Sequence, residues 1–247
     1  MKPVRLVGAA ALSALWLAAC GGPSDDGARV EAPKPPETDS DTTGATDMGA
    51  AAVDGERLLK AGETPAEWLT YNGTYDEQRH SALTGISPEN ISELSPAWTY
   101  DLKTGRGIES TPIVVDGVMY LTSSWSVVYA LDPVTGEELW VHDPEVDKSV
   151  GVKACCDVVN RGVAVYDGKV YVGVIDGRLQ ALDAETGQEH WQVERDEGTN
   201  WSTPFVWQNE DRTELVTAGS DQVRSYDLEG RELWSFTGLN SIAIPQP

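Results

Sequence analysis

Two adjacent cysteines, Cys155 and Cys156, are the residues of this chain whose type and spacing most suggest chemistry. Neighbouring cysteines rarely bond to each other, because disulfide geometry is narrow and deviations from it store strain. In an oxidising compartment such a pair would present a rigid, polarizable sulfur surface. The alternative is that both are buried side chains that act as small hydrophobes. The pair alone leaves both interpretations open, so the surrounding sequence has to decide.

The first residues predict where the protein is located. Lys2 and Arg5 form a short basic start, and residues 6–19 are apolar but too short to span a bilayer as a helix. Small residues precede Cys20, which resembles a bacterial lipoprotein signal. We therefore expect residues 1–19 to be a lipoprotein signal peptide and Cys20 to carry lipid. The protein would be exported to the periplasm and anchored to a bacterial membrane, with the outer membrane favoured. An ordinary signal peptide with an incidental cysteine is the alternative.

Lipidation would also account for the cysteine count. With Cys20 attached to lipid, Cys155 and Cys156 are each other's only partner within the chain, and an oxidising periplasm favours their bond. The sequence contains no Cys-x-x-Cys-His motif, so no c-type haem is expected. The three histidines are scattered along the chain and indicate neither a zinc site nor a catalytic cluster; they are His80, His142 and His190. No metal ligand is predicted.

Charge and composition divide the chain and limit its partners. The formal net charge is −22, which disfavours binding to nucleic acid and to anionic lipid head groups. Membrane contact is therefore expected only through the N-terminal lipid. Residues 20–62 are rich in Ala, Gly, Pro, Thr and Asp and hold few large apolar side chains, which predicts a disordered acidic tether. Residues 63–247 are predicted to form the folded domain.

Most of the predicted folded domain consists of repeats. The run Ala-x-Asp-x-x-Thr-Gly-x-x-x-Trp occurs at 130–140 and 181–191, and a shortened copy occurs at 225–234. Together with an opening partial copy, the repeats place tryptophans at 98, 140, 191 and 234, which are 42, 51 and 43 residues apart. Periods of this length with strand-like segments indicate propeller blades. The longest interval contains residues 146–161, which include the cysteine pair.

Each repeat predicts a β-hairpin followed by a strand that carries tryptophan. Residues 118–122 and 126–131 read as neighbouring strands in the first complete copy. The Asp and the Thr-Gly that follow predict a tight turn, because Asp bonds to the turn backbone and Gly adopts positive φ without strain. We expect each tryptophan to pack between adjacent blades and to donate its indole N–H to a backbone carbonyl. This assigns the four tryptophans a structural role.

The repeat resembles the pyrroloquinoline quinone (PQQ) repeat. More specifically, residues 64 to about 194 resemble the N-terminal part of the PQQ-dependent, or quinoprotein, alcohol dehydrogenases. The runs 68–73, 106–112 and 154–162 carry this resemblance, and the last of them contains the cysteine pair. The resemblance implies an all-β fold, a partial β-propeller of tryptophan-docked four-stranded blades. The chain would supply about three to four blade equivalents of an eight-bladed ring.

The same resemblance implies a cofactor site. Cys155 and Cys156 would form a vicinal disulfide that stacks on one face of the quinone ring. Arg161 would pair with a PQQ carboxylate or quinone oxygen, which suits a planar bidentate donor, and Glu109 would hydrogen-bond to the cofactor rim. The alternative for Arg161 and Glu109 is a surface charge or a contact at a blade end. In complete enzymes of the family, PQQ with calcium oxidises an alcohol while a carboxylate base takes the hydroxyl proton.

The C-terminal third departs from that family. Where the enzymes carry a Gly-Gly-Ala-Glu run with a calcium-binding Glu, residues 215–227 are shorter and hold no such Glu. Asp221 is the nearest carboxylate, and it is predicted to lie in a hairpin turn. Residues 195–247 instead resemble plain PQQ-like repeats without a cofactor. No catalytic residue is therefore assigned, and the chain is expected to be a truncated propeller that is inactive alone or is completed by a second chain. An alcohol substrate and an electron acceptor are the other expected partners.

A non-enzymatic lipoprotein is the competing class. The outer-membrane-barrel assembly propeller is also a lipid-anchored protein of PQQ-like repeats, and it acts as a binding scaffold. The acidic tether, the lipoprotein signal and the plain third repeat fit this alternative. The Cys-Cys run does not, because a scaffold has no use for a quinone-stacking disulfide. Binding of PQQ that depends on Cys155 and Cys156 would separate the two classes.

Overall fold

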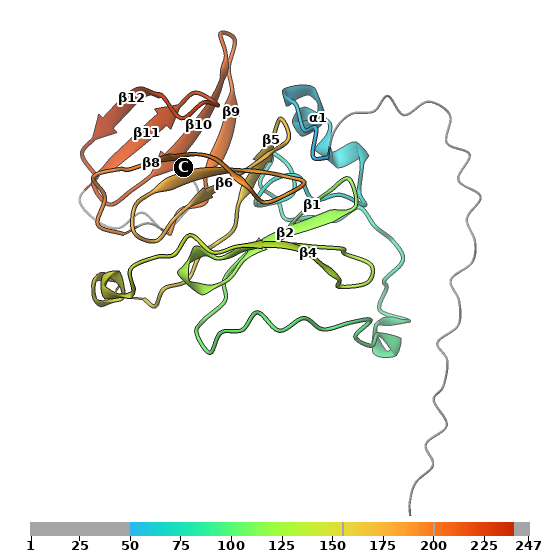
Figure 1. Cartoon of the computed structure of the whole chain (residues 1–247). Helices are drawn as coiled ribbons and strands as arrows, with labels where there is room; N and C mark the ends of the chain where they lie inside the picture. Colours follow the sequence, from blue (N-terminus) through green and yellow to red (C-terminus); the bar gives the residue numbers. More distant parts are fainter. Residues whose placement is uncertain (1–49, 155, 200, 240–247) are drawn as a thin grey trace, which may run out of the picture. The chain divides into compact units, whose positions relative to one another are not determined.

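β-Strands dominate the part of the chain that the computed structural model describes, which is residues 50–154, 156–199 and 201–239. Within these residues the strands form three four-stranded antiparallel sheets, each with its strands adjacent in chain order (Figure 1). We call them blade 1, blade 2 and blade 3. The predicted all-β class and four-stranded repeat of a partial propeller are confirmed. The strands are β1 Ile113–Val115, β2 Val118–Thr122, β3 Val128–Leu131 and β4 Glu138–His142 in blade 1, β5 Ala164–Tyr166, β6 Lys169–Gly173, β7 Leu179–Asp183 and β8 Glu189–Val193 in blade 2, and β9 Phe205–Gln208, β10 Thr213–Ala218, β11 Gln222–Tyr226 and β12 Glu232–Thr237 in blade 3.

Helices are few and short in the described part. α1 spans Gly55–Leu59, and 3₁₀ turns span Ala61–Glu63, Ile91–Glu93, Ser124–Ser126 and Lys148–Lys153. Of the residues that the model describes, none belongs to a helix long and apolar enough to cross a membrane.

The repeated Asp and the Gly that follows it form the turn between the third and fourth strand of each blade, with Thr before the Gly in blades 1 and 2 and Glu229 in blade 3. In blade 1 the Asp132 carboxylate accepts the N–H groups of Val134 and Thr135 at 2.7 and 2.8 Å. Gly136 then has a φ of +74°, a value at which a side chain would be strained. The corresponding carboxylates are Asp183 and Asp227, and the corresponding glycines are Gly187 and Gly230. The turn predicted from the sequence is therefore present in all three blades.

The repeated tryptophans join successive blades, as predicted. Trp140 on β4 of blade 1 donates its indole N–H to the Ala184 carbonyl of blade 2 at 3.1 Å. Its ring also covers Gly187, where an added Cβ would lie 2.6 Å from the ring. Trp191 on β8 repeats this arrangement with the Leu228 carbonyl at 3.0 Å and with Gly230 of blade 3. Trp98, which precedes β1, packs in the same way on Pro133 and Gly136 of blade 1.

Trp234 on β12 is the exception among the four. Its indole N–H donates to the Glu214 carboxylate on β10 of the same blade, at 2.6 Å. In the other three cases the acceptor is a backbone carbonyl of the turn that the ring covers. The structural role of Trp234 is therefore to satisfy a buried carboxylate within blade 3.

The segment that begins at residue 50 corrects the predicted domain boundary. The tether was expected to reach residue 62, but Ala51, Val53 and Leu58 are at most 3% exposed and belong to the core cluster. The backbone carbonyls of Val53 and Ala51 also accept N–H groups of the β5–β6 turn at 2.9 and 3.1 Å. The tether prediction is therefore wrong over residues 50–62, because the few apolar side chains there pack against the blades. The predicted leader and the rest of the predicted tether lie outside the described residues.

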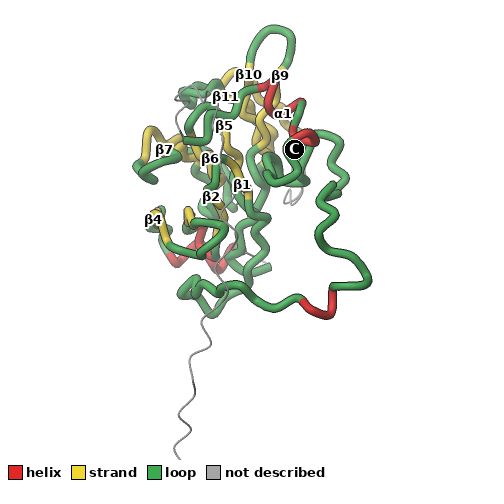
Figure 2. The backbone as a smooth tube through the Cα atoms, turned by 90° about the vertical axis from the view of Figure 1, so that its right-hand side faces the viewer, coloured by secondary structure: helices red, strands yellow, loops and turns green. Residues whose placement is uncertain are grey.

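This N-terminal segment contacts all three blades. Arg57 forms an ion pair with Asp116 in the β1–β2 turn at 2.7 Å, and Trp68 pairs with Val114 through an isolated bridge next to β1. The Tyr75 hydroxyl donates to the Val206 carbonyl on β9 at 3.0 Å. Figures 1 and 2 show α1 beside β9, the first strand of blade 3. The segment therefore fastens the first strands of the blades together.

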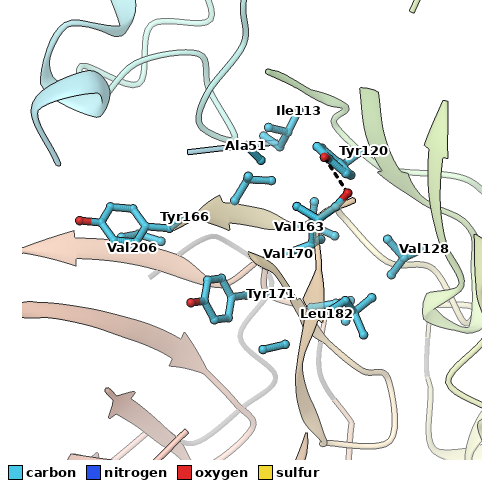
Figure 3. Packing of buried hydrophobic residues seen from close by; sticks show 14 of the residues in the cluster. Ala51, Ile113, Tyr120, Val128, Val163, Tyr166, Val170, Tyr171, Leu182 and Val206 are labelled. Atoms are coloured by element: carbon cyan, nitrogen blue, oxygen red, sulfur yellow. Dashed lines mark hydrogen bonds between the residues drawn. The ribbon is translucent and has the colours of Figure 1, made fainter. Parts of the chain in front are cut away.

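The hydrophobic core lies between the blades and the N-terminal segment. Figure 3 shows Ile113 of β1, Tyr120 of β2 and Tyr171 of β6 gathered with Ala51 of the N-terminal segment. Most core side chains are Val, Leu, Ala and Tyr, and more than half of the core residues lie on the strands. This packing gives the loops between the blades a rigid base.

Candidate functional site

The candidate site lies at one end of the blades. Strands alternate in direction, so each turn between the second and third strand shares an end with the segments that connect one blade to the next. These turns are residues 123–127, 174–178 and 219–221, and the connecting segments are 101–112, 143–163 and 194–204. We call this set the connection end. Hydrogen bonds link its parts across blades, as between the Trp125 N–H and the Val158 carbonyl at 2.8 Å.

Glu109 and Arg161 meet at the connection end, although 52 residues separate them in the sequence. The Arg161 Nη2 atom lies 2.5 Å from Glu109 Oε2, and the side chains are 19% and 46% exposed, respectively. The Arg161 carbonyl accepts the Thr111 N–H at 3.0 Å, which holds the two connecting segments together. Within the part of the chain that the structure describes, the Arg161 Nη1 group is buried and has no hydrogen-bond partner. The Nη1 group of Arg161 therefore remains available to donate a hydrogen bond to a ligand.

Asn160 fixes the backbone that carries Arg161. Its side chain is buried, and its Oδ1 atom accepts the Thr122 hydroxyl and the Gly162 N–H at 3.0 Å each. Its Nδ2 atom donates to the Ser126 hydroxyl at 3.0 Å and to the Gly173 carbonyl at 2.8 Å. Sequence reasoning used Asn160 only as part of a recognisable run and missed this role. The available signal was an Asn between two apolar residues, Val158 and Val159, and the charged Arg161.

The cysteine pair lies on the same connecting segment. Cys156 is exposed, while Cys155 lies outside the described residues, so the predicted disulfide stays a prediction. Asp157 follows Cys156 in a left-handed conformation with a φ of +72°. Backbone N–H groups of Gly107 and Val158 lower the pKa of the Asp157 carboxyl, and Arg106 adds to this effect. Sequence reasoning also missed Asp157, whose contacts depend on segments far away in the sequence.

At the connection end of blade 3, the Glu197 carboxylate is occupied by protein partners. Glu197 is buried, forms an ion pair with Arg224, and accepts the Ser220 and Asp221 N–H groups at 2.6 and 3.4 Å. Only glycine fits at Gly219, because an added Cβ would lie 2.1 Å from the Glu197 carboxyl carbon. Asp221 lies in the predicted hairpin turn between β10 and β11.

The structure can be tested against the two groups that the sequence implies. A planar anionic ligand fits the buried, unpartnered Nη1 group of Arg161. Calcium finds no match, because the described residues contain no group of three or more His, Cys, Asp or Glu side chains that could hold a metal ion. We therefore assign no calcium ligand among the described residues.

Comparison with known proteins matches the same part of the chain. The family model for PQQ, described as glucose/ethanol/alcohol dehydrogenase, β-propeller domain, matches residues 68–193. The chain is 46% identical over 197 residues to the quinohemoprotein alcohol dehydrogenase ADH-IIG of Pseudomonas putida. It is 51% identical over 164 residues to the quinohemoprotein alcohol dehydrogenase of Comamonas testosteroni, and 57% identical over 128 residues to the 1-butanol dehydrogenase (cytochrome c) of Thauera butanivorans.

These relatives are much longer than the matched region. The matches cover 75%, 65% and 51% of this chain but only 27%, 23% and 18% of the relatives. Among solved structures, the Pseudomonas putida ADHIIG enzyme superposes with a TM-score of 0.70 at 45% identity, over 78% of this chain and 29% of that one. A europium-containing methanol dehydrogenase superposes with a TM-score of 0.67 at 33% identity, over 74% of this chain and 34% of that one. The resemblance predicted from the sequence is confirmed over this stretch.

Proposed function

We propose that this chain, which belongs to the PQQ family of glucose/ethanol/alcohol dehydrogenase β-propeller domains, forms one wall of a PQQ-binding site in an alcohol-oxidising enzyme. The observation that carries the proposal is the buried Nη1 group of Arg161, which has no hydrogen-bond partner among the described residues, while Nη2 of the same guanidinium pairs with Glu109. A buried guanidinium donor without an acceptor is costly unless a ligand supplies one. The carboxylates and quinone oxygens of PQQ are acceptors of the right kind.

Each residue of this wall has a defined task in the proposal. Arg161 donates to a carboxylate or quinone oxygen, and Glu109 holds the guanidinium in place while it faces the cofactor rim. Cys155 and Cys156 form the vicinal disulfide on which the quinone ring rests. Asn160 fixes the backbone between the cysteine pair and Arg161 through its four hydrogen bonds. Bound PQQ would supply the two-electron oxidation of an alcohol, while the protein positions it.

The catalytic base and the calcium ligands are not assigned to described residues of this chain. We therefore propose that the described blades bind the quinone but do not oxidise alcohol by themselves, and that a complete site needs further blades. A small alcohol and an electron acceptor are the other partners. The expectation that the chain attaches no c-type haem stays a prediction.

We also propose that the protein is exported, with residues 1–19 removed and Cys20 carrying lipid. The small residues before Cys20 support this proposal. Labelled palmitate supplied to bacteria that express the full chain should enter the wild-type protein but not Cys20→Ser. Equal labelling of both proteins would overturn the lipid site, and fractionation of the membranes would test the outer-membrane location.

A PQQ titration of the purified full chain, followed by quenching of tryptophan fluorescence, tests the binding proposal. Wild-type protein should bind, and Arg161→Gln should weaken binding about 10- to 100-fold, because a hydrogen bond to a charged group contributes about 1.5–3 kcal/mol. Cys155→Ser and Cys156→Ser should each weaken it as well. Arg231→Gln is the matched control, since Arg231 is exposed and pairs with Asp227 in the distant β11–β12 turn.

The titration also separates the competing class. Absence of binding by the wild-type chain would contradict the quinone site and favour a non-enzymatic propeller scaffold. Binding that Arg161→Gln and both cysteine variants leave unchanged would place the quinone elsewhere. Alcohol-dependent dye reduction by the purified chain with PQQ and calcium would overturn the proposal that the chain is inactive alone.

A further inference from the structure

Asp157, the residue after Cys156, makes an unusual set of contacts for an exposed loop. Its Oδ1 atom accepts Arg106 Nη1 and the Val158 N–H, both at 2.8 Å. Its Oδ2 atom accepts the Gly107 N–H at 3.1 Å, and its backbone carbonyl accepts the Trp201 indole N–H at 3.2 Å. The segments before β1 and before β9 are therefore tied to one residue.

Trp125 of blade 1 contacts the same loop at Val158, the residue after Asp157. It lies in the β2–β3 turn with a φ of +65°, which is unfavourable for a bulky residue and persists only where surrounding contacts enforce it. Its N–H donates to the Val158 carbonyl at 2.8 Å. The indole ring lies 4.4 Å from Lys148 Nζ and 5.9 Å from the Arg106 guanidinium carbon, which is within range of cation–π attraction.

Two features suggest that these contacts serve the loop more than the fold. The Arg106–Asp157 pair is partly exposed, with 56% and 31% of the side chains accessible, and exposed pairs contribute little to global stability. Asp157 and Trp125 nevertheless both adopt left-handed backbone conformations where the β2–β3 turn contacts the segment that connects blades 1 and 2. Contacts that maintain unfavourable backbone conformations at a partly exposed site point to a requirement for a precise local geometry.

We propose that Asp157 is a positioning residue, held by Arg106, Trp125 and Trp201, that fixes the direction of the chain between Cys156 and Arg161. The proposal rests on the proposed quinone site, because that site gives the geometry its purpose. Asp157 does not touch the ligand; it acts through the backbone on either side. The carboxylate bonds to segments 50 and 51 residues earlier in the sequence, so the loop geometry is set by the tertiary fold.

The test uses two measurements on the full chain. Hydrogen exchange, followed by mass spectrometry without quinone, reports the protection of peptides that contain residues 156–160. A PQQ titration reports affinity. Asp157→Ala should raise exchange in these peptides at least about tenfold and weaken PQQ binding about tenfold, with blade peptides unchanged. Asp157→Asn should recover much of both, because its amide oxygen still accepts the Val158 N–H and Asn tolerates a left-handed conformation.

Asp143→Ala is the matched control, since Asp143 is exposed on the same connecting segment and also accepts a backbone N–H, that of Glu145. It should change neither measurement. Unchanged exchange at 156–160 in Asp157→Ala would overturn the proposal, as would raised exchange with unchanged PQQ affinity. If wild-type protein binds no PQQ, the proposed function fails and the loop geometry loses the purpose given to it. The exchange data would then still show whether Asp157 holds the loop.

Discussion

Equivalent tyrosines in two blades differ in a single hydrogen bond. The Tyr120 hydroxyl on β2 donates to the Ala184 carbonyl of blade 2 at 3.0 Å, next to the bond from Trp140. The Tyr171 hydroxyl on β6 is buried and finds no hydrogen-bond partner among the residues that the structure describes. Burial raises the pKa of both hydroxyls, so both stay neutral at physiological pH. At the residue scale, the same side chain is satisfied in one blade and unsatisfied in the next.

Removing these hydroxyls should therefore have different effects. Tyr120→Phe should lower the free energy of unfolding by about 1 kcal/mol, because the Ala184 carbonyl loses a donor. Tyr171→Phe should be neutral or stabilising, because it removes a buried polar atom that bonds to nothing. Urea denaturation of both variants measures the difference. Equal destabilisation by the two substitutions would show that the hydroxyls are equivalent in solution.

Glu214 on β10 supplies the pH dependence at this scale. Burial opposes ionisation, but hydrogen bonds from Ser225, Trp234, Arg212 and Asn209 outweigh it and lower the pKa of the carboxyl. A carboxyl with a lower pKa in the folded state stabilises the protein above its unfolded-state pKa of about 4.3. That stabilisation is lost as the pH falls through the folded-state pKa.

The free energy of unfolding should therefore drop as the pH is lowered below about 4. Glu214→Gln should show a shallower drop over the same range, because glutamine does not titrate. Glu229→Gln, at an exposed position in the β11–β12 turn, is the control and should follow the wild-type curve. Urea denaturation at a series of pH values measures this, and identical slopes for all three proteins would contradict the assignment.

At the scale of the element, the Thr-Gly turn and the tryptophan of the preceding blade form one unit. Gly187 needs to be glycine for two reasons: its φ is +70°, and the Trp140 ring occupies the space of a side chain. Gly117 in the β1–β2 turn has a similar φ of +75° but open space around it. Substitution of the two glycines therefore separates the free-energy cost of a left-handed backbone from the cost of displacing the tryptophan that joins the blades.

Gly117→Ala should cost about 1–2 kcal/mol, the penalty of a left-handed conformation for a residue with a Cβ. Gly187→Ala should cost about 1–3 kcal/mol more, because the methyl group must displace the Trp140 ring. Denaturation midpoints measure the difference, and near-ultraviolet circular dichroism should report the altered indole only in Gly187→Ala. Equal losses of unfolding free energy in the two variants would mean that the Trp140 ring moves aside at no cost.

At the scale of the whole described fold, the segment from residue 50 to Tyr75 acts with the tryptophans to join the blades. Trp140 and Trp191 each connect two neighbouring blades, whereas this segment contacts blades 1, 2 and 3. Leu58 places its side chain in the common core and is 3% exposed, while its neighbour Leu59 is 75% exposed. A stretch with the composition of a tether therefore contributes to the stability of the propeller arc.

Leu58→Ala should lower the free energy of unfolding by about 2–5 kcal/mol, the usual cost of removing a buried leucine. Leu59→Ala should change it by less than about 0.5 kcal/mol, as for an exposed position. Thermal and urea unfolding of the two variants provide the measurement. A neutral Leu58→Ala would support the original prediction that the folded domain begins after residue 62.

The sequence by itself determined the blades and their joints, because the information for each lies within a few residues. An Asp and a Thr-Gly define a turn locally, and a tryptophan at a fixed place in each repeat implies a fixed neighbour. Only the tertiary structure decided how the candidate site is built. The pairing of Glu109 with Arg161 and the contacts that hold Asp157 come from segments far apart in the chain. The role of residues 50–62 was hidden for the same reason: composition reports how many apolar groups a segment has, whereas burial depends on the surfaces that the rest of the fold presents to them.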